Sequence, residues 1–221
     1  MSDKVNLRVD WCSYEAAKYA VEKWHYSGCM PRGSQCYLGV WENAKFIGVV
    51  VIGRSISPNI GTSYNLTQHE CAELTRVALS KHNASVSKIL SVCISRVKKE
   101  YPGLRLLISF ADSEQGHAGT IYQAANWLFV GNSVVTQHLV NGKWRNDTHV
   151  NRFVGRGELA KRKAPPKHKY LYPLDRAMRK QIAPLAQPYP KRVSCGLSVE
   201  SDTVGDQPTG AGATPAARSE V

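Results

Sequence analysis

Residues 108–131, ISFADSEQGHAGTIYQAANWLFVG, combine the end of a strand, a polar loop and the start of a helix. The apolar run Leu104–Ala111 predicts a strand that stops at Asp112. A loop of small and polar residues follows, and the next helical segment has Tyr122 in its first turn. In open α/β sheets, ligand sites lie beyond the carboxyl ends of strands, where helix N-termini also gather. Asp112 is therefore either a helix cap or a catalytic group that works with Tyr122.

The segments around this stretch predict a mixed α/β sandwich that ends near residue 155. Ser13 is a candidate N-cap for the first helix, and Asn83 or Ser85 for the second. Apolar periodicity and turn signals give the other boundaries. The expected elements are a helix at 13–24, strands at 35–42, 46–53 and 70–79, a helix at 85–101, a strand at 104–111, a helix at 119–126, and strands at 127–135 and 147–154.

Composition and charge narrow the class of protein. The 221 residues are 43% hydrophobic and 21% charged, which is typical of one globular core, but the net charge is +12. Such an excess favours a polyanionic partner, most simply nucleic acid, over a membrane. No apolar run reaches membrane-spanning length and the first residues, MSDKVNLRVD, do not read as a signal peptide, so we expect an intracellular protein. The six cysteines show no zinc-site spacing and are expected to be reduced thiols.

The segment 156–193 is expected to be a basic extension that contacts DNA, and 194–221 a disordered tail. Residues 156–180 contain nine Lys or Arg and two acids. Cations neutralise phosphates and tyrosines stack on exposed bases, although a solvated run of charge is the usual alternative. The tail has too little apolar content to order itself. The candidate DNA-binding residues are Lys161, Arg162, Lys163, Lys167, Lys169, Tyr170 and Tyr172.

A candidate phosphate site follows the strand at 70–79. Backbone N–H groups at the start of the next helix, small residues and the nearby Arg76 suit a phosphate, although an ordinary helix cap explains the same pattern. The order of elements resembles the GNAT family of N-acyltransferases, in which a loop of pattern Q/R-x-x-G-x-G/A binds the pyrophosphate of acetyl-CoA. The matching positions are His82, Ser85 and Ser87, each of which departs from the pattern. IYQAANW resembles the helix whose tyrosine, here Tyr122, protonates the leaving thiolate in that family.

Four blocks carry a closer resemblance. EKWHYSGCMP, GVWE with FIGVVVIGR, ELTR, and ADSEQGHAGTIYQAANW together resemble the Mom DNA-modification proteins of Mu-like phages, from about Val9 to near Pro173. The resemblance implies a GNAT-like fold and a transferase that converts the exocyclic amine of adenine in DNA to a carbamoylmethylated form. This modification protects phage DNA from restriction. The expected partners are double-stranded DNA and a small-molecule group donor, in the cytoplasm of the host cell.

The resemblance also implies that four residues form the functional site: His25, Tyr26, Asp112 and Tyr122. Iron is a candidate metal for these residues, and acetyl-CoA or a related acyl donor is a candidate cofactor. Residue chemistry alone leaves two uses open. An imidazole, a carboxylate and phenols bind ferric iron, and they equally suit acid–base catalysis. The structural alternative is a histidine at a helix C-terminus, a half-buried tyrosine and a capping aspartate. His117, between two glycines, fits either a structural or a functional role.

Two other functions are consistent with the same residues. One is an acetyl-CoA-dependent N-acetyltransferase that acts on a protein or a small amine. Tight acetyl-CoA binding that does not depend on DNA selects it. The other is a non-catalytic DNA-binding protein with a degenerate acyltransferase core, for which loss of Asp112 leaves DNA binding intact and DNA chemically unchanged in either case.

Overall fold

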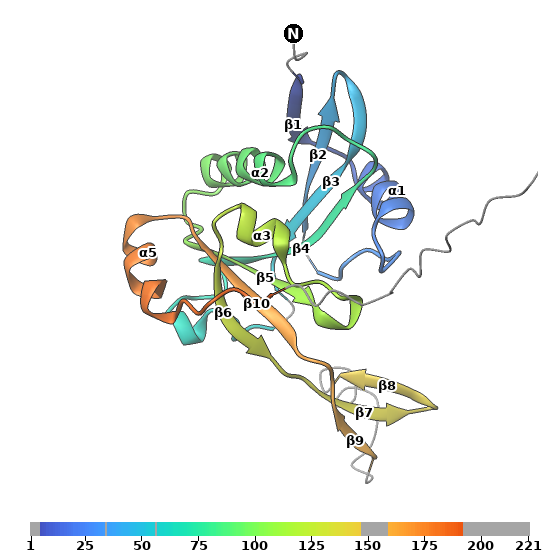
Figure 1. Ribbon diagram of the computed structural model, residues 1–221, viewed down its shortest axis with the longest axis vertical. Coiled ribbons are helices and arrows are strands. Elements are labelled where there is room, and N and C mark those ends of the chain that lie inside the picture. Colours follow the sequence, from blue (N-terminus) through green and yellow to red (C-terminus); the bar gives the residue numbers. More distant parts are fainter. Residues whose placement is uncertain (1–4, 34, 56, 147–158, 192–221) are drawn as a thin grey trace, which may run out of the picture.

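A seven-stranded mixed sheet forms the body of the protein (Figure 1). The computed structural model describes residues 5–33, 35–55, 57–146 and 159–191. The strands follow the order β1-β2-β3-β4-β5-β10-β6, and every neighbouring pair is antiparallel except β4 and β5. This confirms the α/β mixed-sheet sandwich. The strand expected at 147–154 and the tail expected from 194 lie outside the described residues.

The predicted helices and strands that fall among the described residues lie close to their expected boundaries. The strands of the main sheet are β1 (Leu7–Trp11), β2 (Gln35–Glu42), β3 (Lys45–Gly53), β4 (Cys71–Leu79), β5 (Leu106–Asp112), β6 (Leu128–Ser133) and β10 (Lys167–Pro173). The helices are α1 (Tyr14–Trp24), α2 (Val86–Glu100), α3 (Thr120–Ala124) and α5 (Arg176–Ile182). Ser13 caps α1 and Ser85 caps α2, because each hydroxyl accepts a backbone N–H three residues on.

Side chains that alternate along β3 are buried against helices on the two faces of the sheet. Val49 and Val51 belong to the apolar cluster under α1, whereas Val50 and Ile52 belong to the larger cluster that also contains the buried face of α2. Successive side chains of a strand point to opposite faces, so a continuous apolar run is the pattern expected of a strand covered on both sides. The run FIGVVVIG thus explains why the sheet is a central layer.

Two strands of the main sheet were not predicted, and neither were α5 and the three strands of the smaller sheet described below. β1 pairs with β2 at one edge of the sheet, and β10 lies between β5 and β6 in its interior. The boundary near residue 155 therefore needs correction, because part of the segment expected as a basic extension completes the main sheet. Lys167 and Lys169 give β10 a basic character, but Tyr170 and Leu171 are fully buried in it.

The parallel strands β4 and β5 separate at the middle of the sheet. Their pairing runs from Cys71 and Leu106 to Leu74 and Ser109. At the same level, the register of β4 with β3 shifts, leaving Thr75 as a bulged residue. A bulge bends its strand, and bulges are common next to active sites. The carboxyl-terminal halves of β4 and β5 therefore diverge and leave room for a pocket.

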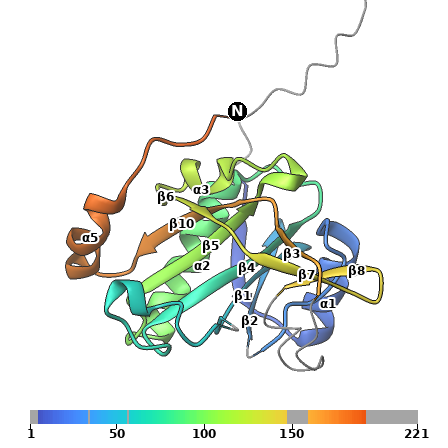
Figure 2. The same ribbon diagram turned by 90° about the horizontal axis from the view of Figure 1, so that it is seen from below.

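A second, three-stranded sheet projects from the body (Figures 1 and 2). It consists of β7 (Thr136–Val140), β8 (Lys143–Asn146) and β9 (Lys161–Lys163), and we call it the wing. The wing continues β6 and leads into β10, so its two roots join the main sheet at neighbouring strands, of which β10 pairs with β5. Within the described part of the chain, no helix has the length and apolar character needed to cross a membrane.

Candidate active site

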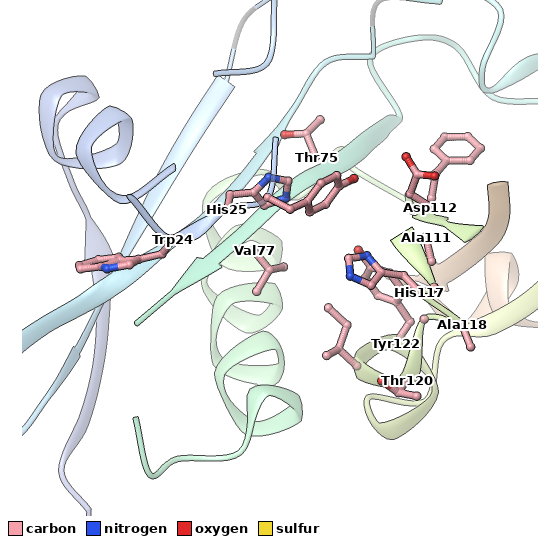
Figure 3. Close-up of a pocket in the computed structure, with 15 residues that line it drawn as sticks. Trp24, His25, Thr75, Val77, Ala111, Asp112, His117, Ala118, Thr120 and Tyr122 are labelled. Atoms are coloured by element: carbon pink, nitrogen blue, oxygen red, sulfur yellow. The ribbon is translucent and has the colours of Figure 1, made fainter. Parts of the chain in front are cut away.

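A pocket of about 470 Å³ occupies the space where β4 and β5 diverge (Figure 3). Four elements contribute to it: the end of α1, β4, β5 with the loop after it, and α3. The lining residues are Trp24, His25, Tyr26, Thr75, Val77, Phe110, Ala111, Asp112, Gly116, His117, Ala118, Gly119, Thr120, Ile121 and Tyr122. The structure thus brings together all four residues that we expected to act together, and it adds His117.

Tyr122 lies at the inner end of this pocket, where the two strands part. Its hydroxyl is 2.7 Å from Ser109 Oγ, and Ser109 Oγ is 2.8 Å from the carbonyl oxygen of Leu74. A carbonyl only accepts, so Ser109 donates to Leu74 and Tyr122 donates to Ser109. Burial raises the pKa of Tyr122 to about 12, although the bond to Ser109 opposes the rise. Tyr122 therefore keeps its proton at neutral pH.

Asp112 ends β5 and has two partners. Its Oδ1 accepts the backbone N–H of Glu114 at 3.1 Å, which caps the short turn at 113–115. Its Oδ2 lies 3.2 Å from the ammonium of Lys167, the residue opposite it on β10. The two interpretations of Asp112 are therefore compatible, because one oxygen caps the turn while the carboxylate lines the pocket.

His25, Tyr26 and His117 form an aromatic row along the pocket. The ring centroids of His25 and Tyr26 are 4.4 Å apart, and those of Tyr26 and His117 are 5.2 Å apart in an edge-to-face arrangement. Burial, assisted by the nearby Arg76, lowers the pKa of His25 to about 4, so its imidazole is neutral. Burial and the negative charge of Asp112 raise the pKa of Tyr26. At neutral pH the row therefore carries the protonated phenol of Tyr26.

Comparison with known proteins finds likenesses in structure and in sequence. A spermidine/spermine N-acetyltransferase from Vibrio cholerae is 11% identical, with a TM-score of 0.47, and covers 79% of this chain and 96% of its own. A putative acetyltransferase from Salmonella typhimurium, solved with acetyl-CoA, is 11% identical, with a TM-score of 0.46 and coverages of 77% and 95%.

The sequence matches are more extensive. A protein named methylcarbamoylase Mom, from Escherichia phage Mu, is 29% identical over an alignment of 202 residues that covers 84% of each chain. The model of the Mom protein family matches residues 6–191. The chain belongs to the Mom protein family. In this Mom protein the family match includes both sheets and every residue of the pocket.

The four pocket residues do not fit an iron site in this Mom protein. A ligating imidazole offers one bare nitrogen and donates its other N–H to a partner. Here Nδ1 of His25 accepts the backbone N–H of Ser27 at 3.1 Å, so the proton of the neutral ring is on Nε2. The phenol of Tyr122 is bonded to Ser109, and Asp112 is paired with Lys167. No cluster of three or more His, Cys, Asp or Glu suited to a metal occurs among the described residues.

The expected phosphate loop binds a carboxylate of the Mom protein itself. Glu42, buried at the end of β2, accepts the backbone N–H groups of Asn83 at 3.0 Å and of Ala84 at 2.7 Å. Burial alone would raise the pKa of Glu42, but these bonds outweigh it and the net pKa is lowered. Two N–H donors that suit a phosphate are therefore already taken, and a CoA diphosphate does not fit at these two positions.

The residues predicted to hold the donor's phosphate do not form one cluster around the pocket. His82 Nδ1 bonds to the carbonyl of Ser80, and the hydroxyls of Ser85 and Ser87 contact each other at the start of α2. None of these three lines the pocket. Arg76 lies on β4, where its guanidinium donates to the carbonyl oxygens of Cys29 and Thr75. Arg76 is therefore the member of this set that influences the pocket, through its charge near His25.

The predicted DNA-binding residues separate into exposed and buried groups. Lys161, Arg162 and Lys163 are exposed on the wing, which leaves them available to a partner. Lys167 pairs with Asp112, and Lys169 lies over the ring of Tyr64 at 5.0 Å.

Tyr170 needs correction as a base-stacking residue, whereas Tyr172 is half-buried and stays a prediction. Tyr170 is fully buried, and its hydroxyl bonds to the carbonyl of Ala118. Tyr172 packs against Trp127, with ring centroids 5.4 Å apart. Tyr170 lies in an interior strand rather than in a basic extension, which explains the difference.

Three residues that shape the site were not predicted from the sequence. Ser109 is a polar residue inside the apolar run LLISFA, a signal that marks a bonded or functional hydroxyl. Thr75 forms the bulge of β4, and no local pattern indicates it. Glu42 follows an apolar strand like many surface carboxylates, so its contact with the loop at 83–84 depends on the tertiary fold.

Proposed function

We propose that this Mom-family protein is a transferase that converts the exocyclic amine of adenine in DNA to an N6-carbamoylmethyl form, and so protects phage DNA from restriction. The observation that carries the proposal is the pocket, in which a carboxylate, a protonated phenol and an aromatic row meet beside a basic wing. The name of the phage Mu relative, methylcarbamoylase, agrees with transfer of this group.

Asp112 is the proposed proton acceptor. An adenine amine is weakly nucleophilic because its lone pair is delocalised into the ring, so removing its proton as the new bond forms assists attack. Asp112 lines the pocket and its side chain is 15% exposed, which leaves it accessible from the pocket. Its neighbour Lys167 keeps the carboxylate close to the wing, where we propose that DNA lies.

Tyr122 is the proposed proton donor. The new bond joins N6 of adenine to the methylene carbon of the transferred group, one amine proton passes to Asp112, and the bond to the leaving group breaks. The leaving group takes the proton of Tyr122, which burial retains on the phenol at neutral pH. Ser109 holds the hydroxyl at the inner end of the pocket.

The adenine has to leave the base stack to reach this pocket. Enzymes that modify a base inside a duplex extrude the nucleotide and hold it against aromatic side chains. Tyr26 is 55% exposed and belongs to the aromatic row, so it is available to such a base. The pocket volume of about 470 Å³ lies in the range of small-molecule sites.

The transfer step requires a donor that carries the whole carbamoylmethyl group, amide nitrogen included, with its leaving group on the methylene carbon. An acetyl thioester alone contains no such nitrogen and delivers an N6-acetyl product. The carbamoylmethyl and acetyl products differ in mass, so analysis of the product distinguishes the two donors.

Mass spectrometry of nucleosides from plasmid DNA of expressing cells tests the proposal. Asp112→Asn keeps the capping oxygen and removes the charge, while Glu114→Gln removes a nearby exposed charge outside the pocket. We expect a heavier adenosine species with the wild type and Glu114→Gln, and none with Asp112→Asn. Unmodified DNA from folded wild-type protein contradicts the proposal and favours an acetyltransferase for another amine or a non-catalytic DNA-binding protein.

A further inference from the structure

The wing contains basic residues on strands that lie outside the main sheet. Its strands β7, β8 and β9 form a sheet apart from the main one, and all three residues of β9 are exposed. The sequence of these strands contains Lys143, Arg145, Lys161, Arg162 and Lys163, and no Asp or Glu. Strands that are rich in Lys and Arg and contain no Asp or Glu indicate a surface for a polyanion.

Arg162 is held in place by two neighbours on the other strands of the wing. Its Nε donates to the side-chain oxygen of Gln137 on β7 at 3.0 Å. Its guanidinium carbon lies 4.6 Å from the ring centroid of Trp144 on β8. A guanidinium fixed by stacking and one hydrogen bond loses less entropy when it binds, and its terminal N–H groups form a fork that fits phosphate oxygens. No carboxylate pairs with it among the described residues.

Cations lie on both faces of the wing. Because side chains of a strand alternate, Arg162 points to one face of β9 while Lys161 and Lys163 point to the other. A flat anionic membrane binds cations gathered on one face. A strand with cations on both faces instead fits between two rows of phosphates, as found on either side of a DNA groove.

We infer that the wing docks on duplex DNA with its strands at a groove, and that Arg162 is its fixed phosphodiester-binding residue. The inference rests on the proposed function for the identity of the nucleic acid. β10 starts at Lys167, four residues after the end of β9, and Lys167 lies opposite Asp112. DNA held by the wing therefore runs past the mouth of the pocket.

Fluorescence anisotropy with a short labelled DNA duplex, at salt concentrations between about 50 and 200 mM, tests the inference. Arg162→Gln removes one charge from the wing, and Lys99→Gln removes one from the exposed end of α2. We expect Arg162→Gln to reduce the slope of log affinity against log salt by about one, and Lys99→Gln to leave it unchanged. Equal behaviour of these two variants overturns the inference.

Arg162→Lys distinguishes the contribution of the planar guanidinium group from the contribution of its positive charge. Lysine keeps the charge but neither stacks in a plane nor forms a fork, so we expect the salt slope to persist while affinity falls by about three- to tenfold. Affinity equal to that of the wild type overturns the role of the fork. Binding to vesicles that contain phosphatidylserine is measured with the same variants. If the Arg162 variants lose vesicle binding but keep DNA binding, the wing binds a membrane and the inference is overturned.

The same variants distinguish failure of this inference from failure of the proposed function. If Arg162→Gln weakens DNA binding while wild-type protein leaves nucleosides unmodified, the wing docks DNA but the transferase proposal fails. If wild-type protein modifies adenine and Arg162→Gln binds and modifies DNA equally well, the transferase proposal stands and the wing inference fails.

Discussion

Lys167 and Asp112 are cross-strand partners of β10 and β5, and their side chains form an ion pair of 3.2 Å at the point where the wing joins the main sheet. The Lys167 side chain is 47% exposed, so a DNA phosphate can reach its ammonium, whereas that of Asp112 is 15% exposed. This pair connects the surface proposed to bind DNA with the group proposed to accept the proton.

Asp112→Asn is expected to bind DNA more tightly while it loses transfer activity. The variant removes a negative charge beside the wing and releases Lys167 to contact phosphate, which predicts about a two- to fivefold gain in affinity. Anisotropy with a DNA duplex measures the gain, and Glu114→Gln controls for the loss of one nearby negative charge. Weaker binding by Asp112→Asn contradicts this electrostatic arrangement.

Tyr122→Phe is expected to slow transfer without unfolding the protein. It removes one hydroxyl that donates to Ser109, at a cost of about 1 kcal/mol, while Ser109 keeps its bond to Leu74. Loss of a general acid predicts a rate lower by about 100-fold or more. Single-turnover modification of DNA measures the rate, and a thermal melt checks the fold. A normal rate reassigns Tyr122 to packing.

Glu42→Gln is expected to disturb the loop before α2. An amide offers one oxygen where the carboxylate offers two, so when that oxygen accepts from Asn83 and Ala84 its NH₂ group still faces the N–H of Asn83. We expect a lower melting temperature and fast hydrogen exchange at the backbone amides of Asn83 and Ala84.

In the wild type, we expect added CoA to leave the NMR signals of the Asn83 and Ala84 amides in place, since Glu42 accepts both N–H groups. A shift of both signals on adding CoA shows that the diphosphate displaces Glu42.

The sequence predicts the layers of this fold better than the order of its strands. The run FIGVVVIG and the caps Ser13 and Ser85 have local causes, and the corresponding elements lie where periodicity places them. β10 was missed because its lysines precede only a short apolar run, and its place between β5 and β6 is set by pairing over long sequence distances.

The pocket shows the same contrast between residues that the sequence indicates and contacts that only the folded chain creates. His25, Tyr26, Asp112 and Tyr122 were expected together from the family resemblance, and the fold collects them in one pocket. Their partners are less visible in the sequence. Contacts such as Asp112 with Lys167 join segments far apart in the chain, and no local pattern encodes them. Their functional roles stay predictions until the variants are measured.

His25 is expected to make the protein sensitive to acid. Its pKa is lowered from 6.5 to about 4, chiefly by burial, so the unfolded chain binds the proton more readily than the folded one. The stabilising contribution of the neutral ring is complete above pH 6.5 and is lost as the pH falls through about 4. His25→Gln removes the titrating imidazole. As the pH falls from 6.5 to about 4, the melting temperature of this variant should therefore fall less than that of the wild type. Exposed His69→Gln is the control, and an unchanged pH profile for His25→Gln contradicts the assignment.

Gly119→Ala is expected to destabilise the protein more than Gly116→Ala, although both glycines lie in the loop before α3 with positive φ, +73° and +67°. An added Cβ at Gly116 meets nothing within 4 Å, so only the left-handed backbone costs energy, about 1 kcal/mol. At Gly119 the Cβ overlaps the ring of Tyr170, whose burial in β10 prevents it from moving aside, which adds about 1–3 kcal/mol. Urea unfolding measures both, with Gly103→Ala as a control in open space. Equal losses for the two loop variants mean that Tyr170 can yield, and that β10 holds the loop before α3 less firmly than its burial indicates.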